Sequence, residues 1–222
     1  EEKMYMKVTS VYGLTETAPG MTASRIDDPF DVRCNTVGHD FEFTEVKVID
    51  PETGEECPVG VQGEMCNRGY NTMKGYYKNP EATAETLKDG WLYTGDMAEQ
   101  DADGFIYLVD RKKDVIISGG ENIYPVQIEN FLSKYPKVKD VAVIGLADPR
   151  LGEITAAIIE TKDGVECTED EINEFCKELP RYKRPRRIIF EDVPRNATGK
   201  IEKPLLRKKH KSDNLVAAEN NA

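Results

Sequence analysis

The segment DRKKDVIISGGENIYP, residues 110–125, divides the chain into two parts with different sequence patterns. It opens on a run of charges, continues through a short apolar strand pattern into a double glycine, and ends at a proline that can occupy the first turn of a helix. A solvated linker would account for the charges, but such linkers seldom combine them with a double glycine that follows a strand and precedes a helix. We therefore predict a domain boundary near residue 110.

Before this boundary the sequence is dominated by strand patterns. Residues 41–50 alternate apolar and polar positions, which is typical of a half-buried strand. One helix is expected to begin at Pro80, with Asn79 as its N-cap, and to run to about Leu87, with Asp89-Gly90 as the signal that stops it. Residues 1–110 are thus predicted to form a β-rich unit, either a barrel or a small curved sheet. Its further strands are expected at residues 63–69, 91–100 and 104–109, the last two joined by a turn.

After the boundary, strands and helices alternate. A helix that opens at Pro125 has apolar residues at i, i+3, i+4 and i+7, and Thr168 with Glu171 forms the capping box of a second helix. We therefore predict a compact α+β domain over residues 111–210, followed by a polar, disordered tail at 211–222. Its strands are expected at residues 115–117, 141–146, 154–159 and 187–191, and its last helix at 201–208.

The composition excludes several classes of protein. With 222 residues, of which 39% are hydrophobic, the chain can form one large or two smaller domains. Its longest apolar run, residues 141–147, is too short to span a bilayer, and its first residues, EEKMYMKVTS, do not have the basic start and apolar block of a secretory signal. Residues 6–13 alternate like a strand that has almost nothing before it, so we expect a chain cut from a longer protein.

The numbers and spacing of the cysteines and histidines argue against several kinds of disulfide and metal site. The five cysteines are an odd number without C-x-x-C spacing, which argues against a disulfide scaffold or a zinc site and favours the reducing cytoplasm. The two histidines, His39 and His210, are too few for a multi-histidine metal site. A serine hydrolase is a poor explanation as well, because the sequence has no G-x-S-x-G motif.

The charge of the chain is unevenly distributed. The net charge of −11 argues against nucleic-acid binding by the whole chain, yet residues 181–211 carry 12 basic and three acidic residues. This basic segment could meet an anionic ligand such as a phosphate, or it could be a solvated helix face. Nucleic-acid binding by this segment alone is a poor alternative, because it is short of the interleaved aromatic residues on which bases stack.

Four short segments hold polar residues that turns and caps alone do not explain. In YGLTET, residues 12–17, hydroxyl groups and the Glu16 carboxylate follow a strand on a glycine-hinged loop. This pattern suits phosphate and Mg²⁺, but it also fits a plain exposed turn. In YTGD, residues 93–96, Asp96 could accept hydrogen bonds from a ribose diol or could be an ordinary turn residue. The boundary segment, with its double glycine, is the third.

The fourth segment is PRNATGKI, residues 194–201, which places Lys200 on a glycine-bearing loop at the entry of a helix. It is not a Walker loop, because Pro194 stands where that motif requires a glycine. The loop could bring a point charge to a developing phosphate or carboxylate anion. Alternatively, Lys200 is simply one more basic residue of a basic segment.

In this order, the four segments resemble those of the adenylate-forming (AMP-binding) enzymes, which include acyl-CoA synthetases, the adenylation domains of peptide synthetases, and luciferase. The resemblance runs from about residue 8 to residue 208, and the stretches GYYKNPEATAET and DGWLYTGDMAEQDADGFIYLVDRKKD add to it. It implies an α+β fold in which residues 1–110 are the β-rich, barrel-like end of a large N-terminal domain. Residues 111–210 would be the small, mobile C-terminal domain.

The resemblance also implies roles for residues of the first part. Thr15 would contact phosphate and Glu16 would ligate Mg²⁺. Tyr12 would lie against the adenine ring. Asp96 would hold the ribose hydroxyls, and Arg111 would assist it there.

For the second part, the resemblance implies a hinge and a catalytic lysine. Lys113 falls at the position where the family has its hinge residue. Lys200 would bridge the substrate carboxylate and the α-phosphate of ATP during adenylation. The loop at 118–124, which contains Gly119 and Gly120, would line the channel for the pantetheine arm of coenzyme A in the second half-reaction.

The family reaction has two steps, and we expect both here. A carboxylate attacks the α-phosphorus of Mg-ATP to give an acyl-adenylate and pyrophosphate, and a thiol, usually that of coenzyme A, then takes the acyl group and expels AMP. The resemblance therefore implies an ATP-dependent acid–CoA ligase that uses ATP, Mg²⁺ and coenzyme A. The GGENIYP stretch and the overall similarity of the sequence to the family favour fatty or other medium-to-long acyl acids as substrates.

One departure from the family pattern concerns the phosphate loop rich in glycine, serine and threonine. This loop belongs upstream of Tyr12 and is not in the sequence. We therefore expect a C-terminal fragment with little activity by itself. Two alternatives stay open: an adenylation domain that loads a carrier protein, and a non-catalytic module that keeps the nucleotide-facing residues without turnover.

Overall fold

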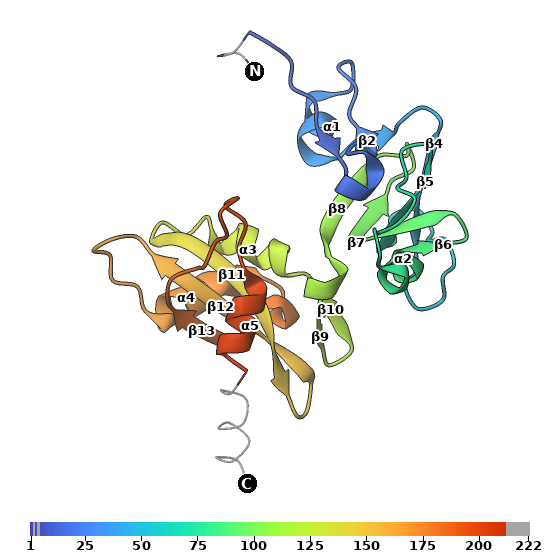
Figure 1. Ribbon diagram of the computed structural model, residues 1–222. Coiled ribbons are helices and arrows are strands. Elements are labelled where there is room, and N and C mark those ends of the chain that lie inside the picture. Colours follow the sequence, from blue (N-terminus) through green and yellow to red (C-terminus); the bar gives the residue numbers. More distant parts are fainter. Residues whose placement is uncertain (2, 4, 212–222) are drawn as a thin grey trace. The chain divides into compact units, whose positions relative to one another are not determined.

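The structure is a computed structural model that describes residues 1, 3 and 5–211 (Figure 1). The chain divides into two compact units, Glu1–Lys112 and Lys113–Ala222. Most of the tail expected to be disordered, residues 212–222, lies outside the described residues. Among the helices that the structure describes, none combines the length and apolar character that crossing a bilayer requires.

The first unit is built on a five-stranded antiparallel sheet in which β7 (Trp91–Gln100) is central. One edge of β7 pairs with β5 (Gly63–Gly69), which in turn pairs with β4 (Thr44–Ile49). The other edge pairs first with β6 (Leu87–Lys88) and then with β8 (Ile106–Arg111). Because no pairing among the described residues joins β4 to β6 or β8, the sheet is open and curled rather than a closed barrel.

A small three-stranded sheet precedes the large one. It consists of β1 (Val11–Tyr12), β2 (Thr22–Ala23) and β3 (His39–Asp40). The strand expected over residues 6–13 is therefore wrong in extent, because the ladder with β2 includes only Val11 and Tyr12. The short helix α1 (Phe30–Asn35) follows β2 and was not expected, since its one fully buried side chain is an arginine, Arg33, rather than an apolar residue.

The helix predicted after Asn79 is present as α2 (Pro80–Thr86), and the Asn79 side chain accepts a hydrogen bond from the Ala82 amide at 3.1 Å. The sequence pattern predicted that Asp89 and Gly90 end this helix, but the helix ends earlier, at Thr86. Asp89 and Gly90 form the two-residue turn between β6 and β7, with φ of 50° and 79°. Tight hairpin turns need positive φ at both positions, which explains the Asp-Gly pair.

The second unit has a sheet in the order β10-β9-β12-β11, with β13 added beside β12. The long hairpin of β11 (Val138–Asp148) and β12 (Gly152–Thr161) forms its centre, and β13 (Arg187–Phe190) is the only parallel strand among those described. The double glycine 119–120 follows a strand and precedes a helix, as the sequence predicts, but a second short strand lies between the glycines and the helix that begins at Pro125. The two glycines form the turn of a hairpin between β9 (Ile116–Ser118) and β10 (Glu121–Ile123).

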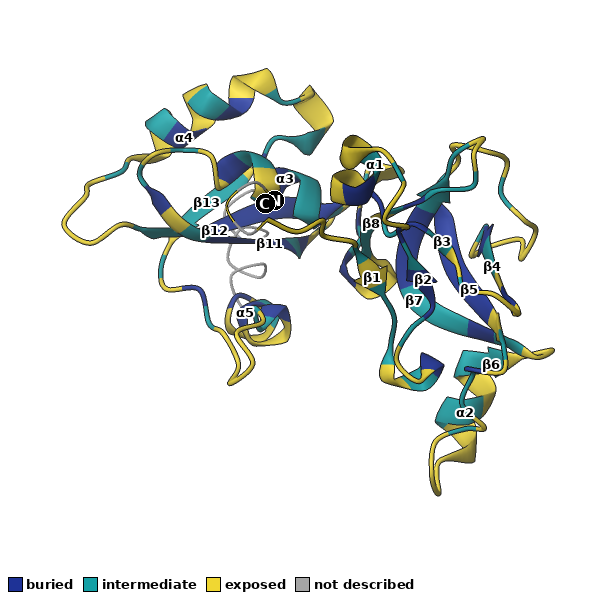
Figure 2. Cartoon of the chain, turned by 90° about the horizontal axis from the view of Figure 1, so that it is seen from above, coloured by how far each residue is buried: buried dark blue, intermediate teal, exposed yellow. Residues whose placement is uncertain are grey.

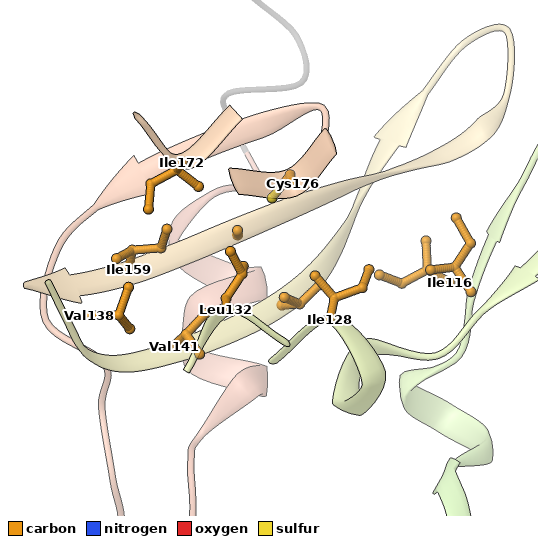
Figure 3. Packing of buried hydrophobic residues seen from close by; sticks show 11 residues of the cluster. Ile116, Ile128, Leu132, Val138, Val141, Ile159, Ile172 and Cys176 are labelled. Atoms are coloured by element: carbon orange, nitrogen blue, oxygen red, sulfur yellow. The ribbon is translucent and has the colours of Figure 1, made fainter. Parts of the chain in front are cut away.

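Alternate residues of the central hairpin face two different cores, so helices cover both faces (Figure 2). One core includes Val141 and Ile159 and is covered by α3 (Pro125–Leu132) and α4 (Glu169–Phe175), as Figure 3 shows. The other core includes Ala142, Ile144 and Ile158 and is covered by α5 (Lys203–Lys209) through Leu206. The capping box predicted for α4 is present, with Thr168 and Glu171 bonded to each other's backbone amides.

Ion pairs fix α5 to the rest of the second unit, and two of them involve Lys203 and Arg207. The Lys203 ammonium lies 2.8 Å from a carboxylate oxygen of Glu129, which also accepts a hydrogen bond from the Val143 amide at 2.7 Å. The Arg207 guanidinium donates to Asp114 at 2.7 Å. Asp114 is buried and lies at the start of this unit, so α5 is tied directly to the first turn of the unit.

Candidate active site

The candidate site in the first unit centres on Asp96, at a bulge in β7. Between the pairs Glu64–Met97 and Cys66–Tyr93, one residue of β5 lies opposite three residues of β7, Thr94–Asp96. Gly95 makes this possible because its φ is +72°, a conformation that suits glycine. The bulge re-aims the side chain that follows it, and Asp96 is 8% exposed.

Two side chains from distant parts of the sequence meet the Asp96 carboxylate. The Tyr12 hydroxyl, on β1, donates a short hydrogen bond to Oδ2. Arg111 stands directly opposite Asp96 in the β7–β8 ladder, and its Nε lies 3.4 Å from Oδ1. Burial, together with the hydrogen bond to Asp96, raises the pKa of Tyr12 far above its usual value, so the phenol remains a hydrogen-bond donor at neutral pH.

A second carboxylate, Glu64, holds the bulge in place from beneath. It is buried, and one of its oxygens accepts a hydrogen bond from the Gly95 amide at 3.1 Å. Its other oxygen lies 2.7 Å from the Lys112 ammonium. Glu64 was not among the expected site residues, and the one signal available was a charged residue next to a glycine at the start of a predicted strand. A charge is buried at such a position only when it is paired and hydrogen-bonded.

The Tyr-Gly-Leu-Thr-Glu-Thr loop folds into a single 3₁₀ turn, Thr15–Thr17. Thr17 is buried and closes the turn, because its Oγ1 accepts from the Leu14 amide at 2.9 Å. Thr15 is exposed, and the hydroxyl that closes the turn is that of Thr17. The Thr15 hydroxyl is therefore the one that can face a ligand.

Glu16 is held at two points. Its backbone carbonyl accepts a hydrogen bond from the Met73 amide at 2.8 Å, and its carboxylate accepts one from the Tyr76 hydroxyl at 2.7 Å. The bond to Glu16 raises the pKa of Tyr76 above its ordinary value. Tyr76 is a second residue that the sequence analysis missed, since nothing in GYYKNP distinguishes its hydroxyl from that of the next tyrosine.

The donor set around Glu16 suits magnesium carried by a phosphate ligand. No group of three or more His, Cys, Asp or Glu side chains that could hold a metal ion by itself occurs in the described part of the chain. Mg²⁺ is usually bound by one or two carboxylates together with waters and substrate phosphates. A single fixed carboxylate such as Glu16 fits that role.

The remaining predicted site residues belong to the second unit. Lys113 is its first residue and is exposed. Gly119 and Gly120 form the tip of the β9–β10 hairpin, with φ of 61° and 88°. Lys200 is exposed on a loop closed by an isolated bridge between Arg195 and Ile201. The structure thus brings together Tyr12, Asp96 and Arg111, while Glu16 lies on the same loop as Tyr12.

The fold, a curled antiparallel sheet followed by an α+β unit, is shared with solved adenylate-forming enzymes. The chain belongs to the AMP-binding enzyme family. The family model for AMP-binding enzymes matches residues 1–77, and the model for the AMP-binding enzyme C-terminal domain matches residues 127–200.

Curated relatives of this chain are acyl-CoA synthetases and ligases. The putative acyl-CoA synthetase YngI of Bacillus subtilis is 48% identical over 212 residues, which cover 94% of this chain and 39% of that protein. The mitochondrial medium-chain acyl-CoA ligase ACSF2 of Rattus norvegicus is 43% identical, covering 92% and 34%. Feruloyl-CoA synthase of Amycolatopsis is 44% identical, covering 89% and 40%. The chain therefore spans between about a third and two fifths of the length of these relatives.

Solved structures give the same assignment. ATP-bound MatB from Rhodopseudomonas palustris matches with a TM-score of 0.84 and 35% identity, covering 92% of this chain and 41% of that one. The o-succinylbenzoate CoA synthetase MenE of Bacillus subtilis, in complex with its acyl-adenylate intermediate, matches with a TM-score of 0.83 and 32% identity, covering 93% and 42%.

Proposed function

We propose that this chain forms part of an ATP-dependent acid–CoA ligase. In that reaction a carboxylate and ATP give an acyl-adenylate and pyrophosphate, and the acyl group then passes to the thiol of coenzyme A. The observation that carries the proposal is the Tyr12–Asp96–Arg111 cluster, a buried and oriented carboxylate in a fold shared with ATP-bound enzymes. The names of the relatives supply the reaction class.

In the proposed reaction, Asp96 accepts hydrogen bonds from the two ribose hydroxyls. Each carboxylate oxygen has more than one lone pair, so Asp96 can keep Tyr12 and Arg111 as partners while it does so. Tyr12 places its ring beside the adenine, and its hydroxyl fixes the rotamer of Asp96. Arg111 offsets the buried negative charge from the opposite strand.

Other residues bind the phosphates of ATP and the Mg²⁺ that neutralises their charge. Glu16 binds the Mg²⁺ that accompanies ATP, and Thr15 donates its hydroxyl to a phosphate oxygen. Mg²⁺ neutralises charge on the phosphates as pyrophosphate departs. We propose that Lys200 contacts the substrate carboxylate and the α-phosphate during adenylation. Nucleotidyl transfer depends mainly on such positioning and charge stabilisation.

The second step uses the other proposed site residues. We propose that rotation about Lys113 withdraws Lys200 after adenylation and brings the Gly119-Gly120 turn to the nucleotide. That turn then lines the channel for the pantetheine arm of coenzyme A. Glycines suit this role because the backbone can approach a ligand closely where there is no Cβ.

For the acid, we propose a fatty or other medium-to-long acyl chain, which agrees with the name of the medium-chain ligase relatives. We also propose that the protein acts in the cytoplasm, on the basis of its cysteine content. The vertebrate relatives are named mitochondrial, so cell fractionation of the source organism tests that location directly.

The test uses the full product of the gene. Pyrophosphate release is measured across a series of carboxylic acids of increasing chain length, and thioester formation is measured with coenzyme A and with a carrier protein. We expect adenylation of medium-to-long acids and transfer to coenzyme A. Transfer only to the carrier protein would contradict the ligase assignment, and no pyrophosphate release with any acid would favour a non-catalytic module.

A variant of the cluster sharpens this test. Asp96→Asn should raise the KM for ATP by on the order of 10-fold or more, because a charge-assisted hydrogen bond contributes about 1.5–3 kcal/mol. Asp103→Asn is the matched control, since Asp103 is an exposed residue of the turn between β7 and β8. An unchanged KM in Asp96→Asn would show that the cluster does not bind the nucleotide.

A further inference from the structure

The loop that carries Lys200 is exposed but highly organised. Residues 195–200 are all exposed, and the four-carbon stem of a lysine adds further freedom to its ammonium group. A charge that must meet a developing anion is effective only when it is held in place beforehand. The structure shows which side chains restrict the backbone of this loop.

The first of these is Arg195, which joins the loop to the central hairpin. Its Nε and Nη2 bind the two carboxylate oxygens of Asp140, on β11, at 2.7 and 2.9 Å. Its Nη1 donates to the carbonyl of Gly199 at 2.5 Å. The planar guanidinium can make these three bonds at once, so the residue directly before Lys200 is tied to the most buried strand pair of its unit.

The second is Asn196, whose side-chain oxygen accepts three hydrogen bonds from within the loop. The donors are the Thr198 amide at 3.0 Å, the Thr198 hydroxyl at 2.7 Å and the Lys200 amide at 3.0 Å. The Asn196 amide in turn donates to the Lys200 carbonyl at 2.9 Å. Both backbone polar groups of Lys200 are therefore held by Asn196.

We propose that Arg195 and Asn196 are positioning residues for Lys200. They fix the backbone from which the ammonium group projects, so that only the lysine side chain itself has to be ordered when the acyl-adenylate forms. This inference rests on the proposed function, in which Lys200 acts in the adenylation step. It differs from a purely structural role, in which the same contacts only stabilise the second unit.

The two half-reactions separate these roles. With the full gene product, adenylation is followed as pyrophosphate release, and the second step is followed separately by supplying the acyl-adenylate together with coenzyme A. Arg195→Ala and Asn196→Ala should each slow adenylation by on the order of 10- to 100-fold, the scale of a misplaced catalytic group. Thioester formation from the supplied adenylate and the melting temperature should not change.

Three further variants make the comparison specific. Arg195→Lys keeps the charge but cannot bridge Asp140 and Gly199 in the same way, so it should fall between Arg195→Ala and the native protein. Lys177→Ala removes an exposed ion pair with Glu174 on the same unit, and both steps should be unaffected. The double variant Arg195→Ala/Lys200→Ala should be no slower than Lys200→Ala, because residues that act as one unit are non-additive.

The outcomes distinguish the inference from the function on which it rests. If Lys200→Ala leaves pyrophosphate release unchanged, the proposed role of that lysine fails. If Lys200→Ala slows release but Arg195→Ala and Asn196→Ala do not, the inference alone is overturned. It is also overturned if both steps slow together with a lower melting temperature. Should Arg195→Ala not fold, Asn196→Ala still decides the question, since it leaves the Arg195–Asp140 pair intact.

Discussion

At the scale of single residues, Glu64 supports the bulge that carries Asp96, because its carboxylate accepts a hydrogen bond from the Gly95 amide and pairs with Lys112. Tyr12, Asp96 and Arg111 could each be named from short motifs, and the structure brings them together although Tyr12 is 84 residues from Asp96. Glu64 could not be named, because its burial arises from the Gly95 amide and Lys112, which approach it only in the folded sheet. Short motifs therefore indicate candidate site residues better than the residues that support them.

The cysteines provide a residue-scale prediction about the fold. Burial raises the pKa of Cys66 to about 12 and that of Cys176 to about 11, so neither thiol forms much thiolate at pH 8. Cys34 is exposed. Iodoacetamide at pH 8 should therefore alkylate Cys34 rapidly and leave Cys66 and Cys176 unmodified, as judged by mass spectrometry of tryptic peptides.

Denaturant supplies the control for this experiment. In urea all five cysteines should react, because unfolding removes the burial that protects Cys66 and Cys176. Rapid alkylation of Cys66 in the native protein would contradict its place in the β5–β7 ladder.

At the scale of elements, helices with clear capping residues and strands with an apolar pattern were predicted correctly. The capping residues of α2 and α4 and the strands β5 and β7 lie where the sequence indicated. The Asp89-Gly90 pair was misinterpreted, because an Asp-Gly pair can end a helix or turn a hairpin. The partner strand β6 has only two residues, too few to show an alternating pattern. Helix α1 is short and has no apolar periodicity, so tertiary packing decides its conformation.

The capping box of α4 gives a prediction at this scale. Thr168→Ala removes the side-chain oxygen that accepts from the Glu171 amide at 3.3 Å, which should destabilise the helix start by about 1 kcal/mol. Native-state hydrogen exchange at the Glu171 amide should then be faster by about 5-fold.

Thr168→Ser is the conservative comparison, because serine keeps the accepting oxygen and should exchange at nearly the native rate. Equal acceleration in the alanine and serine variants would mean that the hydroxyl does not cap α4. Amides of β5 in the first unit serve as an internal reference, since the substitution is in the other unit.

At the scale of the whole molecule, the sequence pattern placed the boundary near residue 110, and the chain divides after Lys112. The two-residue difference has a physical cause. Strand β8 continues to Arg111, which pairs with Asp96, and Lys112 is held by Glu64. Patterns of hydrophobicity do not contain these polar contacts, so they end the strand too early.

The proposed hinge gives a prediction for the whole molecule. Proline fixes φ near −65° and so restricts rotation. In the full gene product, Lys113→Pro should reduce thioester formation far more than pyrophosphate release. Lys113→Ala, which keeps the backbone free, should affect both steps little. Equal losses of both activities in the proline variant would rule out a hinge at Lys113.

The ion pair between Arg207 and Asp114 has a consequence for how the second unit could be handled by evolution or by a protein engineer. The pair joins positions 93 residues apart, so the two ends of the segment 114–207 are neighbours in space. That segment could be replaced by its counterpart from a homologous protein at two adjacent junctions. The exchange would transfer the Lys200 loop together with its supporting contacts.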